Sequence, residues 1–254
     1  MAEPNALTRQ FDDAAQIYDE VRPRYPEEII EHIIAQGRIF EVGCGTGQMT
    51  LPFAQRGYAI VAIDQGERLA ALAAQHCQPY PQVRVVACAF EAWQDMPGSY
   101  DMFLAASAIH WIEPRYSIAR AAELLKLGGT ITLVGTADHS QGSAFWQATE
   151  PIYHHYNPVD SSATLQPRWP GAVYRQTLCT SGPFVDLQEV RHAWTRRYSG
   201  EEYIKLLWTR SDHRAMPEPN RSRFFAAIGQ VIVQMGGAVI RHYETVALLA
   251  KKGA

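Results

Sequence analysis

IFEVGCGTGQMT, residues 39–50, joins an apolar run to a segment with helical character and carries a glycine at every second position from Gly43 to Gly47. Glycine has no Cβ, so its backbone can turn tightly and approach a ligand closely. In a doubly wound α/β sheet, ligands bind beyond the carboxyl ends of the strands, near the switch point of the topology. The stretch therefore predicts the first strand of such a sheet and the loop that receives its ligand.

Strands and helices alternate around this stretch. Short apolar runs predict strands over residues 38–43, 58–64, 83–90, 100–107 and 130–136. Helical stretches lie between them, at about 46–56, 66–77 and 114–126. Near-continuous apolar strands joined by helices indicate a parallel sheet covered on both faces, and right-handed crossovers make it doubly wound. The pattern therefore predicts an α/β fold with a doubly wound, mostly parallel sheet.

The alternation breaks after residue 136. A helical stretch up to Pro158 precedes residues rich in Ser, Pro and Gly, and two later strand-like runs bring the expected number of strands to seven. We interpret the chain as one domain, 1–254, with a helical cap inserted among the late strands. Its expected parts are a cofactor-binding core over about 11–136, cap elements over about 140–182 and 199–237, and late strands over 184–198 and 238–251.

The composition argues against several classes of function. A formal net charge of −3 over 254 residues gives no global reason to expect nucleic acid or an anionic membrane as a partner. The first residues lack the layout of a signal peptide, and no apolar run approaches the roughly 20 residues of a membrane helix. Four cysteines without CxxC spacing and nine scattered histidines form no metal motif. We expect a cytoplasmic protein without a metal.

The chemistry around the glycine loop separates two kinds of ligand. A dinucleotide fingerprint, G-x-G-x-x-G, needs its third glycine where this chain has Gln48. Glu41 precedes the loop and would repel a pyrophosphate, whereas it attracts a ligand that carries an ammonium and a sulfonium group. The loop amides and the following helix N-terminus can still receive one carboxylate. These features disfavour a nicotinamide-dependent oxidoreductase and favour S-adenosylmethionine as the cofactor.

Asp64 ends the second predicted strand, 17 residues after Gly47. A carboxylate at this place can accept hydrogen bonds from both hydroxyls of a ribose. The alternative is a helix N-cap, because a helix is predicted to follow directly. The residue alone leaves both roles open, and the glycine loop favours ribose binding.

Several ordered motifs resemble those of class I S-adenosylmethionine-dependent methyltransferases. EVGCGTG together with Asp64 is similar to the cofactor signature of that family. The other similar segments are FDDAAQIYDEVRPRYP, AFEAW at 89–93, YDMFLAASAIHW at 100–111 and ELLKLGGTITLV. The resemblance covers roughly residues 11–136 and is strongest to the branch with the trans-aconitate methyltransferases. It implies a Rossmann-like methyltransferase fold and a small-molecule acceptor.

The resemblance also implies cofactor contacts along the carboxyl edge of the sheet. They are Gly43 and Gly45 at the methionine part, Asp64 and Gln65 at the ribose and the adenine edge, Phe90 and Glu91 at the adenine, and Ala106 beneath the cofactor. Many relatives carry an Asp where this chain reads Ala89-Phe90-Glu91. The adenine amino group is therefore read either by Glu91 or by the backbone, and the alternative role of Phe90 is core packing.

Tyr18 and Arg22 lie four residues apart and are predicted to share a helix face. Arg22 is expected to pair with the cofactor carboxylate and Tyr18 to cover the methyl-donor end. This interpretation rests mainly on the resemblance. The alternative is a helix that braces the sheet, with Arg22 in an ordinary salt bridge.

Methyl transfer from a sulfonium is an in-line displacement with a neutral leaving group, so alignment in a dry pocket provides much of the acceleration. A general base is needed where the acceptor loses a proton, as a phenol, amine or hydroxyl does, and not for a carboxylate. His110 is the candidate base; orienting a loop is its alternative role. For the whole chain, the alternative is a non-catalytic S-adenosylmethionine-binding protein.

The predicted cap is rich in aromatic residues, which either face an apolar or aromatic acceptor or form a small core of their own. They are Trp146, Tyr153, Tyr156, Trp169 and Tyr174. Three arginines on a late strand either attract an acidic substrate or form a solvated strand face, namely Arg191, Arg196 and Arg197.

Overall fold

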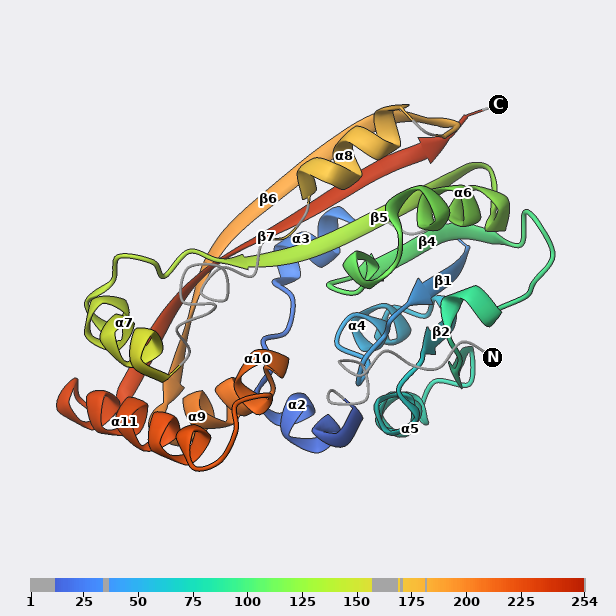
Figure 1. Cartoon of the computed structure of the whole chain (residues 1–254). Helices are drawn as coiled ribbons and strands as arrows, with labels where there is room; N and C mark the ends of the chain where they lie inside the picture. The colour runs from blue at the N-terminus through green and yellow to red at the C-terminus, as the bar shows by residue number, and fades with distance from the viewer. Residues whose placement is uncertain (1–11, 34–36, 157–168, 170, 181, 254) are drawn as a thin grey trace.

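The computed structural model describes residues 12–33, 37–156, 169, 171–180 and 182–253. Its centre is a seven-stranded sheet of order β3-β2-β1-β4-β5-β7-β6 (Figure 1). β1 to β5 pair in parallel, whereas β7 runs antiparallel to both β5 and β6. The strands are β1 Arg38–Val42, β2 Ala59–Asp64, β3 Val83–Ala87, β4 Tyr100–Ala106, β5 Leu125–Asp138, β6 Phe184–Ser199 and β7 Ala238–Lys252. The predicted doubly wound, mostly parallel sheet is confirmed.

Helices cover both faces of this sheet. One face packs against α3 (Glu27–His32), α4 (Thr50–Gln55) and α5 (Glu67–Cys77), and the other against α6 (Pro114–Leu124) and α8 (Gly171–Thr180). Within the described ranges, no helix combines the length and the apolar character that crossing a membrane requires.

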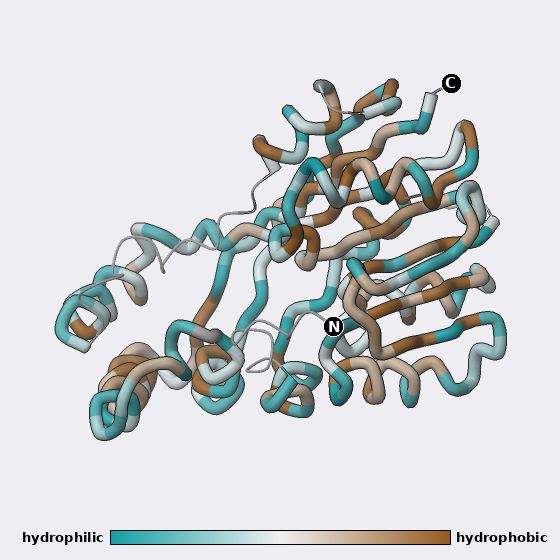
Figure 2. The backbone as a smooth tube through the Cα atoms, turned by 45° about the vertical axis from the view of Figure 1, so that its right-hand side comes forward, coloured by the Kyte–Doolittle hydropathy of each residue, from teal (hydrophilic) through white to brown (hydrophobic). Residues whose placement is uncertain are grey.

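The two cores follow from the alternation of side chains along each strand. Ile39 of β1 is fully buried with Ile29 and Phe53 on the α3–α4 face. The next residue, Phe40, is equally buried on the α6 face, where its ring lies 5.0 Å from that of Tyr100. Because successive Cβ atoms point to opposite faces, a continuous apolar run is what a strand covered on both sides requires. The hydrophobic colouring along the central strands in Figure 2 shows the same pattern.

A third core lies beyond the carboxyl edge of the sheet. It joins three helices, α7 (Ala144–Tyr156), α9 (Gly200–Trp208) and α11 (Asn220–Gln234), to the ends of β6 and β7. Tyr198, Tyr203 and Phe224 are fully buried at its centre. The short helix α10 (Ser211–Arg214) follows α9, and the N-terminal helix α2 (Ala15–Val21) packs against both α9 and α5. The long strands therefore carry a second helical layer to the ligand-binding edge of the sheet (Figure 1).

Several predicted boundaries shift. The third strand ends at Ala87, and Phe90–Ala92 forms a short 3-10 helix instead. The helix predicted from residue 46 begins only at Thr50, because Gly45 and Gly47 adopt positive φ angles that a helix excludes.

Helix α8 lies in the second half of residues 140–182, a range predicted to contribute to the cap. It packs against α6, β6 and β7, and its Tyr174 and Leu178 are buried in the core of the α6 face. This part of the segment therefore covers the sheet rather than joining α7.

Candidate active site

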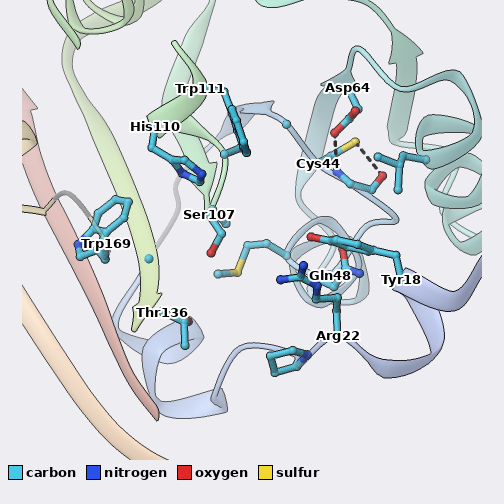
Figure 3. A pocket seen from close by; sticks show the side chains of 18 of the residues that line it. Tyr18, Arg22, Cys44, Gln48, Asp64, Ser107, His110, Trp111, Thr136 and Trp169 are labelled. Carbon is cyan, nitrogen blue, oxygen red and sulfur yellow. Dashed lines mark hydrogen bonds between the residues drawn. The ribbon is translucent and has the colours of Figure 1, made fainter. Parts of the chain in front are cut away.

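A cavity of about 730 Å³ lies at the carboxyl ends of β1, β2, β4 and β5 (Figure 3). Residues of α2, α7, α9 and β7 complete its wall. This volume falls within the roughly 300–1,000 Å³ of small-molecule and cofactor sites. Every predicted site residue lines it: Tyr18, Arg22, Glu41, Gly43, Gly45, Asp64, Gln65, Phe90, Glu91, Ala106 and His110. The sequence reasoning thus selected residues that the fold brings together, while their individual roles stay predictions.

The glycine loop leaves β1 in a conformation that favours glycine. Gly43 and Gly45 have φ angles of +68° and +57°. A Cβ on Gly43 would lie 2.2 Å from the Cβ of Ala108, so a side chain there collides with the loop after β4. The Gly43 amide donates to the Ile63 carbonyl at 2.8 Å, which ties the loop to β2. The backbone is therefore exposed to the cavity at the switch point of the sheet.

Asp64 is held in the cavity wall by two backbone amides. Its Oδ2 accepts from Gly45 N at 2.9 Å and its Oδ1 from Gly66 N at 2.8 Å, which joins the glycine loop to the turn before α5. Burial raises the pKa of Asp64, and these two hydrogen bonds oppose the rise. The N-cap interpretation fails, because Asp12 accepts from the amides of Arg68 and Leu69 in the first turn of α5.

Glu41 lies on the inner wall beneath the glycine loop. It is only 1% exposed, and its Oε2 accepts a hydrogen bond from the Thr50 hydroxyl at 2.6 Å. Burial raises the pKa of Glu41 to about 7, and the nearby Asp64 contributes to the rise. A cationic group in the cavity would stabilise its ionised form.

Tyr18 and Arg22 come from the N-terminal helix and the residue that ends it. The Arg22 guanidinium lies over the Tyr18 ring, 4.9 Å from the centroid. Its Nε donates to Thr209 Oγ1 at 2.9 Å and Nη2 to the Thr209 carbonyl at 3.2 Å. Arg22 thus spans from α2 to the end of α9, and these hydrogen bonds replace the ordinary salt bridge of the alternative interpretation. Figure 3 shows both side chains on one side of the cavity.

Phe90 both packs in the core and lines the cavity. It is 4% exposed, and its ring lies 5.7 Å from Phe103 and 6.1 Å from Tyr116. Its two predicted roles are therefore compatible. Gln65 and Glu91 lie exposed at the same end of the cavity.

His110 lies on the short 3-10 helix Ile109–Trp111 and points into the cavity (Figure 3). Its ring lies 4.9 Å from that of Trp111, and it makes no hydrogen bond within the part of the chain that the structure describes. Desolvation by the cavity wall lowers the pKa of His110, so its imidazole is neutral at pH 7. A neutral imidazole without a partner can accept a proton.

Two hydrogen-bonded residues of the cavity wall, Ser107 and Tyr25, were missed by the sequence reasoning. Ser107, directly after β4, has a φ of +54°, which is uncommon for a residue other than glycine. Its Oγ accepts a hydrogen bond from the Tyr25 hydroxyl at 2.9 Å. Backbone strain of this kind concentrates at functional sites. No sequence motif marks the pair, because its members lie 82 residues apart.

The far part of the cavity is lined by aromatic side chains and two ion pairs. Of the five aromatic residues predicted for the cap, Trp146, Tyr153 and Trp169 line it. Tyr174 instead donates to the Ile109 carbonyl at 2.7 Å from the core. Arg210, whose role the sequence leaves open, also lines it, and the lining residues that sequence reasoning missed are Asp138, Tyr203, Leu206, Leu207, Arg241 and Tyr243.

The charges of this far part are paired. Arg241 forms an ion pair with Asp138 and donates to the Tyr203 hydroxyl at 2.5 Å. Arg210 binds Asp212 through Nη2 at 2.7 Å and Nε at 3.2 Å. Arg191, one of the three arginines predicted on β6, lies outside the cavity and pairs with acidic residues of β6 and β7 on the surface.

The strand order with its antiparallel β7, and the cavity at the switch point, define a Rossmann-like methyltransferase fold. Residues 39–129 match the family described as methyltransferase domain. The chain is a class I S-adenosylmethionine-dependent methyltransferase, and S-adenosylmethionine is its cofactor.

Similar proteins agree with this assignment. An uncharacterized methyltransferase of Mycobacterium tuberculosis is 29% identical over 89% of this chain and 86% of its own length. A trans-aconitate 2-methyltransferase of Deinococcus radiodurans is 31% identical, over 42% of this chain and 40% of its own. The structure of a putative type II methyltransferase from Anaeromyxobacter dehalogenans superimposes with a TM-score of 0.63 at 21% identity, covering 91% of this chain and 98% of that one.

Proposed function

We propose that the chain transfers a methyl group from S-adenosylmethionine to a small molecule bound in the far part of the cavity. The observation that carries the proposal is that one cavity has two chemically distinct ends. The strand ends supply Asp64, Glu41 and the glycine loop, whereas α7, α9 and β7 supply aromatic side chains and paired charges. A cavity of about 730 Å³ suits a small metabolite rather than a nucleic acid, in line with the net charge of −3.

The residues at the strand ends fit the cofactor. The absent Cβ of Gly43 lets the glycine loop lie directly against Ala108, and Gly43 and Gly45 face the cavity with their backbone. Asp64, fixed by two amides, is oriented to accept the ribose hydroxyls, and Glu41 faces the ammonium group. Bound there, S-adenosylmethionine supplies an electrophilic methyl group on a positively charged sulfur.

The remaining contacts are assigned along the same wall. Gly45 borders the methionine part, Arg22 holds the carboxylate, and Tyr18 covers the methyl-donor end. Phe90 and Glu91 contact the adenine, Gln65 its edge and the ribose, and Ala106 lies beneath the cofactor. We assign α7, α9 and α11 as the cap that shapes the acceptor site.

His110 accepts the proton of an acceptor that must lose one. Its neutral imidazole faces the cavity and has no hydrogen-bond partner in the described part of the chain. General-base catalysis of this kind contributes about 10²–10⁴-fold to a rate. Displacement of water by the bound cofactor and acceptor would strengthen the electrostatic interactions within the site.

The proposal is tested with purified protein, methyl-labelled S-adenosylmethionine and pools of small carboxylates, phenols, amines and alcohols that include trans-aconitate. We expect label to appear in one pool, together with S-adenosylhomocysteine. A parallel calorimetric titration measures cofactor binding by itself. Cofactor binding without transfer to any pool would contradict a small-molecule acceptor, and transfer to RNA or protein alone would replace it.

A further inference from the structure

The loop after β4 presents two different hydrogen-bonding groups to the cavity, Ser107 and His110 (Figure 3). Ser107 is fixed by its backbone, because its amide donates to the Val134 carbonyl at 2.8 Å and its φ is +54°. The hydroxyl of Tyr25 donates to Ser107 Oγ at 2.9 Å. Since a serine hydroxyl carries one proton, the Ser107 O–H remains free to donate into the cavity.

The Tyr25 hydroxyl donates its hydrogen bond to Ser107 throughout the neutral pH range. Burial raises the pKa of Tyr25 well above its ordinary value, so its phenol stays protonated throughout the neutral range. A hydroxyl that accepts one hydrogen bond becomes a better donor, since chains of hydrogen bonds polarise one another. Ser107 therefore acts as a donor, while the neutral imidazole of His110 offers a proton-accepting nitrogen three residues further along.

A donor and a base beside one another select the acceptor atom by its lone pairs. A hydroxyl oxygen has two lone pairs and one proton. It can accept from Ser107 with one pair, attack with the other and release its proton to His110. A neutral amine has a single lone pair, which a hydrogen bond from Ser107 would occupy.

A carboxylate fits the site poorly for a different reason. It has no proton to give to His110, and the arginines at the far part of the cavity are already paired, Arg241 with Asp138 and Arg210 with Asp212. The remaining arginine of the wall, Arg22, is the one assigned above to the cofactor carboxylate. No arginine of the described lining is thus left to balance a second carboxylate without giving up a partner.

We propose that the methyl acceptor is a hydroxyl group on an aromatic or apolar body, held by Ser107 as hydrogen-bond donor and deprotonated by His110. This inference rests on the proposed function. The acceptor oxygen forms a bond to the methyl carbon as the carbon–sulfur bond breaks, and the bonding electron pair stays on sulfur, which becomes a neutral thioether. The hydroxyl proton passes to a ring nitrogen of His110, and the resulting imidazolium later releases it to water. The aromatic body packs against Trp146, Tyr153 and Tyr243.

A matched set of fluorescent probes tests the inference without turnover. The three probes share one two-ring body and differ in the polar group: 2-naphthol, 2-naphthylamine and 2-naphthoate. Each is titrated against the full chain loaded with S-adenosylhomocysteine, and its fluorescence reports binding. We expect 2-naphthol to bind most tightly, and Ser107→Ala to weaken its affinity by about two- to tenfold through loss of one neutral hydrogen bond. Affinity for 2-naphthylamine should fall less in this variant, because the lone pair of an aromatic amine is delocalised into the ring and accepts a hydrogen bond only weakly.

Two further variants separate the hydrogen bond from the backbone strain. Ser107→Gly relieves the positive φ and still lacks the hydroxyl, so it should bind 2-naphthol as weakly as Ser107→Ala. Tyr25→Phe should give a smaller loss for 2-naphthol than Ser107→Ala does. The matched control is Tyr58→Phe, whose ring packs on Phe53 outside the cavity and which should leave all three affinities unchanged.

The inference is overturned if 2-naphthol binds no more tightly than both analogues, or if Ser107→Ala weakens all three probes equally. Its failure is distinguishable from failure of the proposed function. Label transfer to a carboxylate or an amine from the pools would contradict the hydroxyl acceptor and leave a small-molecule methyltransferase standing. Loss of transfer to every pool, with the cofactor still bound, would contradict the function itself.

Discussion

Replacing Asp64 by alanine tests the role of this carboxylate at the cofactor. In the structure each of its oxygens accepts one backbone amide, so the side chain is preorganised without being saturated, because an ionised carboxylate can accept about four hydrogen bonds. Loss of a charged acceptor should weaken cofactor binding by about 1–3 kcal/mol. At about 1.4 kcal/mol per factor of ten, that corresponds to roughly a 5- to 150-fold rise in the dissociation constant.

The same change also affects folding, and the two effects must be measured separately. The amides of Gly45 and Gly66 lose their acceptor, but they lie at a cavity that water can enter, so we expect a loss of about 1–2 kcal/mol in the free energy of unfolding. Calorimetric titration with S-adenosylhomocysteine gives the dissociation constant, and urea denaturation without ligand gives the stability.

The control for Asp64→Ala is Asp95→Ala. Asp95 accepts a hydrogen bond from the Tyr100 hydroxyl at 2.6 Å and lies outside the cavity, so its loss should lower stability and leave cofactor affinity unchanged. An unchanged dissociation constant in Asp64→Ala, in protein shown to be folded, would refute the reasoning about the ribose.

Three further changes follow from the geometry. Gly43→Ala should abolish measurable cofactor binding, because the new Cβ would collide with Ala108 and displace the glycine loop. Gly57 has a similar φ of +84° but lies in open space, so Gly57→Ala should cost only about 1–2 kcal/mol of stability. Calorimetry measures the cofactor affinity of both variants, and urea denaturation measures their stability. His110→Ala should lower kcat by about 10²–10⁴-fold at unchanged cofactor affinity. The wild-type rate should fall as the pH drops below the depressed pKa of His110, because the protonated imidazole can no longer accept a proton. The pKa of Glu41 is about 7, and a bound ammonium group would lower it, so cofactor binding at pH 7 should release about half a proton. Calorimetry in buffers of different ionisation enthalpy measures this proton release, and Glu41→Gln should abolish it.

The parallel half of the fold could be predicted because its signals are local. Each central strand is a short apolar run, and the positive φ of the loop glycines can be anticipated from their spacing before a helix. Asp64 was found for the same reason, since a residue at the end of a strand must face the ligand edge. Helix α8 was missed because it opens with a glycine beside a segment rich in Ser and Pro, and only its packing on β6 and α6 reveals what it covers.

The far part of the cavity could not be predicted because no short stretch of the chain contains it. Tyr203 and Arg241 reach the cavity from α9 and β7, and their contact joins residues 38 positions apart. Tyr25 and Ser107 meet across a still longer separation. The contact of Arg241 depends on the antiparallel pairing of β7 with β5 and β6, which sets where the end of β7 projects. A sequence pattern reports which residues share a strand or helix face, and not which distant faces meet.

Helix α2 shows how the two ends of the cavity are joined. Asp19 accepts a hydrogen bond from the Thr46 hydroxyl of the glycine loop at 2.7 Å, and the adjacent Glu20 binds Lys205 of α9 at 2.6 Å. Arg22 continues the connection to Thr209. Because one short helix is tied to both the glycine loop and α9, its position sets the distance between these two parts of the cavity wall. Methyl transfer is sensitive to alignment on the scale of an ångström, so this connection explains why an N-terminal segment lies in the wall of a site that the sheet otherwise builds.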